Sequence, residues 1–214
     1  MRGSEQFMVK LNQVSKCIRG QEILDSLTYE FKQGMIYGLC GPNGSGKTMI
    51  LRMIAGLVFP TTGTIEVDGK ILHKTISFPE SVGLIIEHQE MLPELTAYEN
   101  LEYLAKIKKV AGDEEIRDSL QRVGLNSDKI VKKYSLGMKQ RLNIAQAIFE
   151  KPKLILLDEP TNALDQEGVN LVYRILKEEK DKGACILIAT HSQKDLNGIC
   201  DKVLMVADKK MEEV

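Results

Sequence analysis

Residues 41–48 read Gly-Pro-Asn-Gly-Ser-Gly-Lys-Thr and fit G-x-x-x-x-G-K-[ST], the P-loop pattern that holds the phosphates of a nucleotide. An apolar run at 35–40 precedes this stretch, and a second apolar run at 49–54 follows it. That order predicts a buried strand, a glycine loop and an apolar helix. Glycines let backbone N–H groups turn towards phosphate, and a helix N-terminus adds positive potential. The stretch therefore predicts that the chain binds ATP or GTP.

The side chains of this loop have distinct expected roles. Lys47 is expected to reach the β- and γ-phosphates, and the hydroxyl of Thr48 is expected to ligate Mg²⁺. The predicted nucleotide-binding loop comprises Gly41, Pro42, Asn43, Gly44, Ser45, Gly46, Lys47, Thr48 and Met49.

The composition of the whole chain narrows its class. With 214 residues, 43% of them hydrophobic and 28% charged, the chain is typical of a globular protein with a sizeable core. A net charge of −1 argues against a nucleic-acid partner. No apolar run approaches the roughly 20 residues that cross a bilayer, so any work at a membrane is expected to go through a partner. The four cysteines lie far apart and are expected to be buried, in a reducing compartment.

Apolar periodicity divides the chain into an α/β core and a helical insertion. The continuously apolar runs at 154–157 and 185–189 are typical of strands buried on both faces of a parallel sheet. Between 97 and 150 apolar residues recur at helical spacing with no strand among them. Helices are expected after the P-loop, within 97–150 and at 166–182. Strands are expected at 9–14, 27–31, 35–40, 63–67, 82–87, 154–158, 185–190 and 203–206.

An acidic pair ends one of these strands. Asp158 is expected to accept Mg²⁺-bound water opposite Thr48. Glu159 would then project towards the γ-phosphate as a candidate base for the attacking water. Two solvated acids at a strand end are the plain alternative, but the P-loop in the same chain favours the nucleotide role. An acid directly after the metal-binding Asp favours hydrolysis over transfer to a second substrate.

With these motifs the chain resembles the ABC ATPase family, the nucleotide-binding subunits of ATP-binding cassette transporters, over nearly all of 8–211. Residues 134–141, Tyr-Ser-Leu-Gly-Met-Lys-Gln-Arg, stand where the family carries its signature, usually L-S-G-G-Q. Residues 158–165, Asp-Glu-Pro-Thr-Asn-Ala-Leu-Asp, look like the end of Walker B running into the D-loop. His191 matches the switch histidine, and 92–101 resembles the segment that opens the family's helical subdomain.

The resemblance implies a fold and a domain organisation. The fold is α/β, a P-loop NTPase core with a parallel central sheet, an N-terminal antiparallel β subdomain and an inserted helical subdomain. A single nucleotide-binding domain is expected over 8–214. Its core would lie in 8–87 and 151–214, and its helical subdomain in about 88–150. Residues 1–7 resemble an expression-vector scar, with Met8 as a plausible native start.

The resemblance also implies a mechanism with two cassettes and ATP and Mg²⁺ between them, in a homodimer or a pair with a related cassette. Ser135 and the Gly137 N–H, at the start of a helix over 138–149, would bind the γ-phosphate in trans. His191 would hydrogen-bond the γ-phosphate and hold the water, and Asp165 would link the two sites across the dimer. Ser135 could instead be an ordinary N-cap, or serve as both. A histidine at a strand end is often structural.

Three regions depart from the usual family pattern. Leu136 and Met138 stand where Gly and Gln are usual in the signature. Glu87 aligns with the Q-loop glutamine; its carboxylate could still coordinate Mg²⁺ or its water, while adding negative charge near the phosphates. Gln89 could take that role if the loop shifts register. Ile18 aligns with the residue, usually aromatic, that stacks on adenine, so apolar contact is expected to recognise the base.

The segment 85–87 and the altered signature resemble the bacitracin- and lantibiotic-resistance branch of bacterial ABC exporters. That branch implies an ATPase that is cytoplasmic and peripheral on the inner face of the cell membrane, bound to a separate permease. It would power export of a peptide antibiotic or another amphipathic compound. The alternatives are a soluble ABC-type ATPase not coupled to transport and a non-hydrolytic regulatory module. The sequence leaves open the substrate, the transport direction, the permease and the choice between ATP and GTP.

Overall fold

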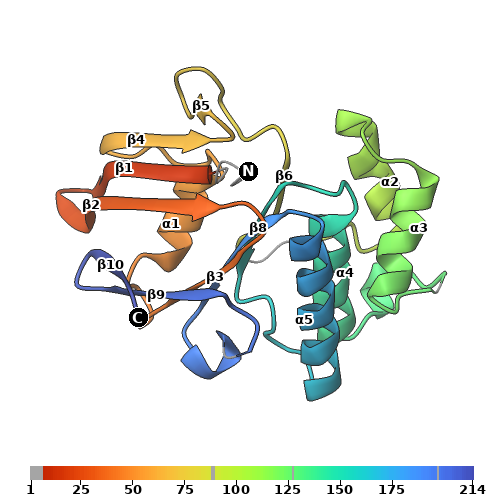
Figure 1. Cartoon of the computed structure of the whole chain (residues 1–214). Helices are drawn as coiled ribbons and strands as arrows, with labels where there is room; N and C mark the ends of the chain where they lie inside the picture. The colour runs from red at the N-terminus through yellow and green to blue at the C-terminus, as the bar shows by residue number, and fades with distance from the viewer. Residues whose placement is uncertain (1–6, 88–89, 127, 197) are drawn as a thin grey trace, which may run out of the picture.

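The computed structural model describes residues 7–87, 90–126, 128–196 and 198–214, and it arranges their strands in two sheets (Figure 1). The first is antiparallel with strand order β2-β1-β4-β5, and the second has the order β10-β9-β3-β8-β7-β6. In the second sheet β9, β3, β8, β7 and β6 run parallel, and β10 returns antiparallel to β9. The strands are β1 (Phe7–Ile18), β2 (Gln21–Lys32), β3 (Ile36–Cys40), β4 (Thr62–Val67), β5 (Lys70–Ile71), β6 (Val82–Ile85), β7 (Leu154–Asp158), β8 (Cys185–Thr190), β9 (Lys202–Ala207) and β10 (Lys210–Glu213).

Helices cover both faces of the parallel sheet, as its apolar strands require. Two short 3₁₀ turns, Val131–Lys133 and Gln193–Leu196, complete the regular structure. In the described part of the chain, no helix is long and apolar enough to cross a membrane. The helices are α1 (Lys47–Ile54), α2 (Ala97–Lys108), α3 (Asp113–Arg122), α4 (Leu136–Ile148) and α5 (Gln166–Asp181).

The central strand β7 shows why the core has two halves. Side chains alternate across a strand, so Leu154 and Leu156 face one cluster while Ile155 and Leu157 face the other. The first cluster contains the buried apolar residues of α1, which lies between the two sheets (Figure 1) and contacts β4 of one sheet and β7 and β8 of the other. The helix that follows the P-loop is therefore held by apolar packing on both sides.

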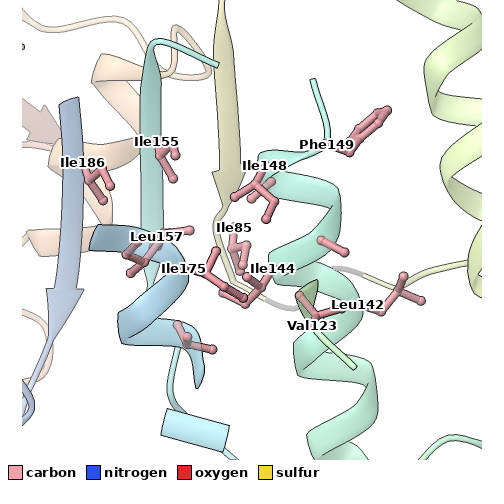
Figure 2. Packing of buried hydrophobic residues seen from close by; sticks show 14 of the residues in the cluster. Ile85, Val123, Leu142, Ile144, Ile148, Phe149, Ile155, Leu157, Ile175 and Ile186 are labelled. Atoms are coloured by element: carbon pink, nitrogen blue, oxygen red, sulfur yellow. The ribbon is translucent and has the colours of Figure 1, made fainter. Parts of the chain in front are cut away.

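The second cluster fixes α4 and α5 against the opposite face of the sheet. Figure 2 shows Ile85, Ile155 and Ile186 from three neighbouring strands packed towards Ile144 and Ile148 of α4. Helices α2 and α3 lie outside α4, away from the sheet (Figure 1). They form the inserted helical part of the molecule, and this architecture confirms the predicted fold class.

Several element boundaries differ from the expectations. Strands β1 and β2 are longer than predicted, because their hairpin contains register shifts that break the apolar alternation. Strands β5 and β10 were not predicted; they are short and largely polar. Strand β6 ends at Ile85, two residues before the expected end. Helix α4 begins at Leu136 instead of 138, because its first turn is exposed and has no apolar periodicity to reveal it. Cys17 is exposed, contrary to expectation.

Candidate nucleotide-binding site

The P-loop joins the end of β3 to the start of α1 and depends on glycine at defined points. Gly46 is the N-cap of α1 and has φ +105°, a left-handed conformation that other residues adopt only with strain. At Gly41 a Cβ atom would lie 2.1 Å from the carbonyl oxygen of Val206 on β9. The first glycine of the loop is therefore required by close packing of the loop against the sheet.

Two polar groups of the loop, on Lys47 and Ser45, are buried and fit a phosphate chain. Lys47 is 7% exposed, and its Nζ donates to the carbonyl oxygens of Gly41 at 2.8 Å and Pro42 at 2.9 Å. The hydroxyl of Ser45 is buried and has no hydrogen-bond partner in the described part of the chain. A buried hydroxyl without a partner is costly, and a phosphate oxygen beside the lysine would satisfy it. The loop therefore fits a nucleotide.

Thr48 and Asp158 meet at the start of α1 and the end of β7, although they lie 110 residues apart in the chain. The Thr48 hydroxyl donates to Asp158 Oδ2 at 2.7 Å. Burial raises the pKa of the Asp158 carboxyl, and the nearby charges of Glu159 and Glu87 raise it further, against the lowering effects of Thr48 and Lys47. A cation would offset this unfavourable negative charge.

The donor set suits Mg²⁺ in the presence of a nucleotide. The described residues contain no group of three or more His, Cys, Asp or Glu side chains that could hold a metal ion by themselves. Mg²⁺ is usually held by one or two carboxylates together with waters and substrate phosphates. Thr48 and Asp158 supply one hydroxyl and one carboxylate beside the P-loop, which fits that mode of binding.

Glu159 is held against the end of β8 by its backbone and by both carboxylate oxygens. It has φ +48°, and its N–H donates to the Ala189 carbonyl at 2.8 Å. Oε1 accepts the backbone N–H of His191 at 3.0 Å and lies 2.7 Å from Nδ1 of the same residue. Because a carboxylate only accepts, Nδ1 carries a proton in this contact. Oε2 accepts the Thr190 hydroxyl at 3.1 Å. Sequence motifs predict Glu159 and His191 as site residues, whereas no motif marks Thr190.

Glu159, together with Lys47, Thr48 and Asp158, borders a cleft of about 340 Å³. Its apolar lining includes Ile18 and Ile23, which flank the turn of the β1–β2 hairpin. Ile18 is the predicted base contact, whereas Ile23 is not among the predicted site residues. Ile23 reaches the cleft because the β1–β2 hairpin closes with Ile18 paired to Gln21, and no motif in the sequence marks that position. The full lining is Ile18, Ile23, Asn43, Gly44, Gly46, Lys47, Thr48, Met49, Asp158 and Glu159.

The Q-loop candidate does not border this cleft. Glu87 follows β6 with φ +60° and forms an ion pair with Arg52 on α1. Its partner in the described structure is therefore a cation of the P-loop helix, and not Thr48 or Asp158. Gln89, the alternative Q-loop residue, lies outside the described residues.

The remaining predicted residues lie together, away from this chain's own cleft. Ser135 is the N-cap of α4 and accepts the Met138 N–H at 3.2 Å. Asp165 is the N-cap of α5 and accepts the Gly168 N–H at 2.8 Å. At Gly137 a Cβ atom would lie 3.2 Å from the Ala163 carbonyl oxygen, so the start of α4 packs against the segment before α5.

A P-loop and an acidic strand end on a parallel core, with an antiparallel sheet on one side and a helical insertion on the other, define a cassette ATPase fold. The model of the family described as ABC transporter matches residues 24–162, and the chain belongs to this family.

Comparison with curated proteins agrees with this assignment. The ABC transporter ATP-binding protein YybJ of Bacillus subtilis is 53% identical over 207 residues, which cover 96% of this chain and 95% of YybJ. The bacitracin transport ATP-binding protein BcrA of Bacillus licheniformis is 38% identical over 210 residues, 96% of this chain and 69% of BcrA. Proteins named for bacitracin and for lantibiotic transport both lie among the matches, which confirms the predicted resemblance to that branch.

A solved structure supports the fold independently. A protein described as the ATP-binding subunit of an ABC transporter superposes with a TM-score of 0.86 at 26% sequence identity. The match covers 95% of this chain and 88% of that protein.

Proposed function

We propose that the chain is the ATP-hydrolysing subunit of an ABC exporter and that it works as a pair of cassettes on a separate membrane permease. The observation that carries the proposal is the contact between Thr48 and Asp158, with Lys47 and Glu159 bordering the same cleft. The start of α1 and the end of β7, which are distant in the sequence, thus bring the phosphate-binding, metal-binding and candidate base groups together in one cleft.

Each of these groups has a part in hydrolysis. Lys47 would bind the β- and γ-phosphates, and Thr48 with Asp158 would hold Mg²⁺, which would supply positive charge to neutralise the phosphates. Glu159 accepts a proton from the attacking water. Because Glu159 and His191 share a hydrogen bond, the histidine orients the carboxylate as well as offering its own ring to the γ-phosphate.

A second cassette completes the site in this proposal. Ser135, Gly137 and Asp165 are the predicted phosphate-binding and linking residues, yet none of them lines the cleft of its own chain. The N-terminus of α4, where Ser135 and Gly137 lie, is a suitable anion-binding group for the γ-phosphate of a partner cassette. The partner is a second copy of this chain or a related cassette.

The names of related proteins support a proposal for the class of exported compound. Proteins of 34–38% identity carry names for bacitracin transport and lantibiotic transport. We therefore extend to this chain the export of a peptide antibiotic or a similar amphipathic compound, with the chain at the inner face of the membrane through its permease.

Hydrolysis is tested with Glu159→Gln in the purified full chain. This substitution keeps the binding groups and removes the base, so steady-state ATP turnover should be abolished while an ATP-bound dimer accumulates in size-exclusion chromatography. Lys47→Ala should instead lose ATP binding in calorimetry. Glu212→Gln on the exposed strand β10 is a matched control that should keep turnover. Wild-type turnover by Glu159→Gln would remove Glu159 from the mechanism.

Coupling to transport is tested by affinity purification of a tagged Glu159→Gln chain from detergent-solubilised membranes of its native cell, with ATP present. Stoichiometric recovery of a multi-span membrane protein is the expected result, and it would identify the permease. Recovery from the cytosol, without any membrane protein, would contradict the transporter role and favour an ABC-type ATPase that is not coupled to transport.

A further inference from the structure

Thr190 is the last residue of β8, and its hydroxyl is buried next to Glu159. The residue is 1% exposed, and it ends a strand whose other members, 185–189, are all apolar. Its Oγ1 lies 3.1 Å from Glu159 Oε2 and 3.2 Å from the backbone nitrogen of Ser192. A buried hydroxyl is expected to be hydrogen-bonded, and this one has two partners.

The chemistry of the two partners fixes the direction of both hydrogen bonds. The Ser192 N–H can only donate, so the Thr190 oxygen accepts from it. The carboxylate of Glu159 can only accept, so the Thr190 proton points to Oε2. The hydroxyl therefore serves as a fixed donor to one oxygen of Glu159, while His191 occupies the other oxygen.

The position of this donor is set by the sheet that also carries the P-loop. In the parallel register Thr190 pairs with Cys40, the last residue of β3 and the one directly before Gly41. On the other side of β8, Ala189 pairs with Asp158, the residue directly before Glu159. The end of β8, with Thr190, thus lies between two strands. One of them, β3, leads into the phosphate-binding loop, and the other, β7, ends in the acidic pair.

We propose that Thr190 is a positioning residue that holds the carboxylate of Glu159 in register with the P-loop for hydrolysis. The proposal rests on the proposed role of Glu159 as the base. Burial alone does not require a hydroxyl here, because valine has nearly the same shape and the strand is otherwise apolar. The hydroxyl is the part of the side chain that acts on Glu159.

The experiment compares Thr190→Val with Thr190→Ser in the purified full chain. Valine keeps the shape and removes the donor, so kcat for Mg-ATP hydrolysis should fall by about tenfold or more, as for a lost hydrogen bond to a charged group. The KM for ATP should stay within about twofold, because the phosphate-binding groups are unchanged. Serine keeps the hydroxyl and should retain most of the wild-type kcat. Thr190→Ala provides a second variant without the hydroxyl if the valine variant is poorly folded.

A matched control and a reference variant distinguish failure of the positioning role of Thr190 from failure of the proposed role of Glu159. Thr28→Val on β2 removes a hydroxyl that accepts the Gln13 N–H, away from the site, and should leave kcat unchanged. The double variant Thr190→Val with Glu159→Gln should still trap the ATP-bound dimer. An unchanged kcat in Thr190→Val, or equal losses in the valine and serine variants, would overturn the positioning role. If Glu159→Gln itself keeps turnover, the proposed base is wrong and the inference falls with it.

Discussion

The guanidinium of Arg122, at the end of α3, lies 2.7 Å from the carboxylate of Glu179 on α5. Glu179 is only 2% exposed, and Lys182 is its second cationic partner at 2.9 Å. The same guanidinium also contacts Glu178 at 2.8 Å. Charged groups thus connect the helical insertion to a helix of the core, at a point where one carboxylate is fully buried.

Removing Arg122 should destabilise the fold more than an ordinary surface substitution would. Arg122→Met leaves the buried Glu179 with Lys182 alone, so the free energy of unfolding should fall by about 2 kcal/mol. Denaturant titration of the purified chain measures the change. Arg174→Met, which removes an exposed cation at 3.9 Å from Glu178, should cost less than about 0.5 kcal/mol. Equal effects of the two substitutions would show that the buried pair does not support the junction.

The ion pair between Arg52 and Glu87 predicts a charge effect on nucleotide binding. Arg52 neutralises the negative charge of Glu87, a carboxylate that raises the pKa of Asp158. Arg52→Met should therefore leave extra negative charge near the phosphates and weaken Mg-ATP binding by about three- to fivefold, since such partly exposed pairs contribute up to about 1 kcal/mol. Calorimetry at low salt measures the affinity.

The double variant Arg52→Met with Glu87→Gln is the control for this charge effect. It removes both charges and should return the affinity to near that of the wild type. If the double variant binds as weakly as Arg52→Met alone, the guanidinium acts in some way other than by neutralising Glu87. High salt should also reduce the difference between the single variant and the wild type, because both side chains are partly exposed.

The apolar base site predicts a gain from an aromatic residue at Ile18. Ile18 is 40% exposed and borders the cleft, so a phenylalanine there can stack on the base without entering the core. Ile18→Phe should tighten ATP binding by about two- to tenfold, the usual range for an aromatic contact. Ile107→Phe, at an exposed position of α2 outside the cleft, should leave the affinity unchanged. No gain from Ile18→Phe would place the base elsewhere.

The sequence predicts the parts of this molecule that depend on local pattern. The P-loop residues and the buried strands β7 and β8 follow from glycine spacing and from continuous apolar runs. The first turn of α4 gave no such signal, because Leu136 is 73% exposed and Gly137 is a poor helix former. Its start is defined instead by the N-cap bond of Ser135.

Contacts between distant segments account for what the sequence could not predict. The pairing of Arg52 with Glu87 and of Thr190 with Glu159 joins residues on separate strands and helices. Their meeting depends on the strand order of the parallel sheet, which no local pattern specifies. Ile23 was missed for a similar reason, since it borders the cleft only once the β1–β2 hairpin has closed.

Two glycines of the P-loop should respond very differently to alanine. At Gly41 the new Cβ would lie 2.1 Å from a backbone oxygen of β9, which cannot move without disturbing the sheet. At Gly44 nothing lies within 4 Å, so alanine suffers only the strain of φ +79°. Gly44→Ala should therefore lower stability by about 1–2 kcal/mol, and Gly41→Ala by clearly more.

Gly183→Ala is the matched control for backbone strain. Gly183 has φ +98°, and nothing lies within 4 Å of an added Cβ atom. It follows α5 and does not line the cleft. Its loss of stability should equal that of Gly44→Ala, while its ATP affinity stays at the wild-type value. Thermal unfolding with and without Mg-ATP measures both quantities. If Gly41→Ala were no less stable than Gly183→Ala, close packing against β9 would not be the reason for the first glycine. The P-loop pattern at that position would then reflect contact with phosphate alone.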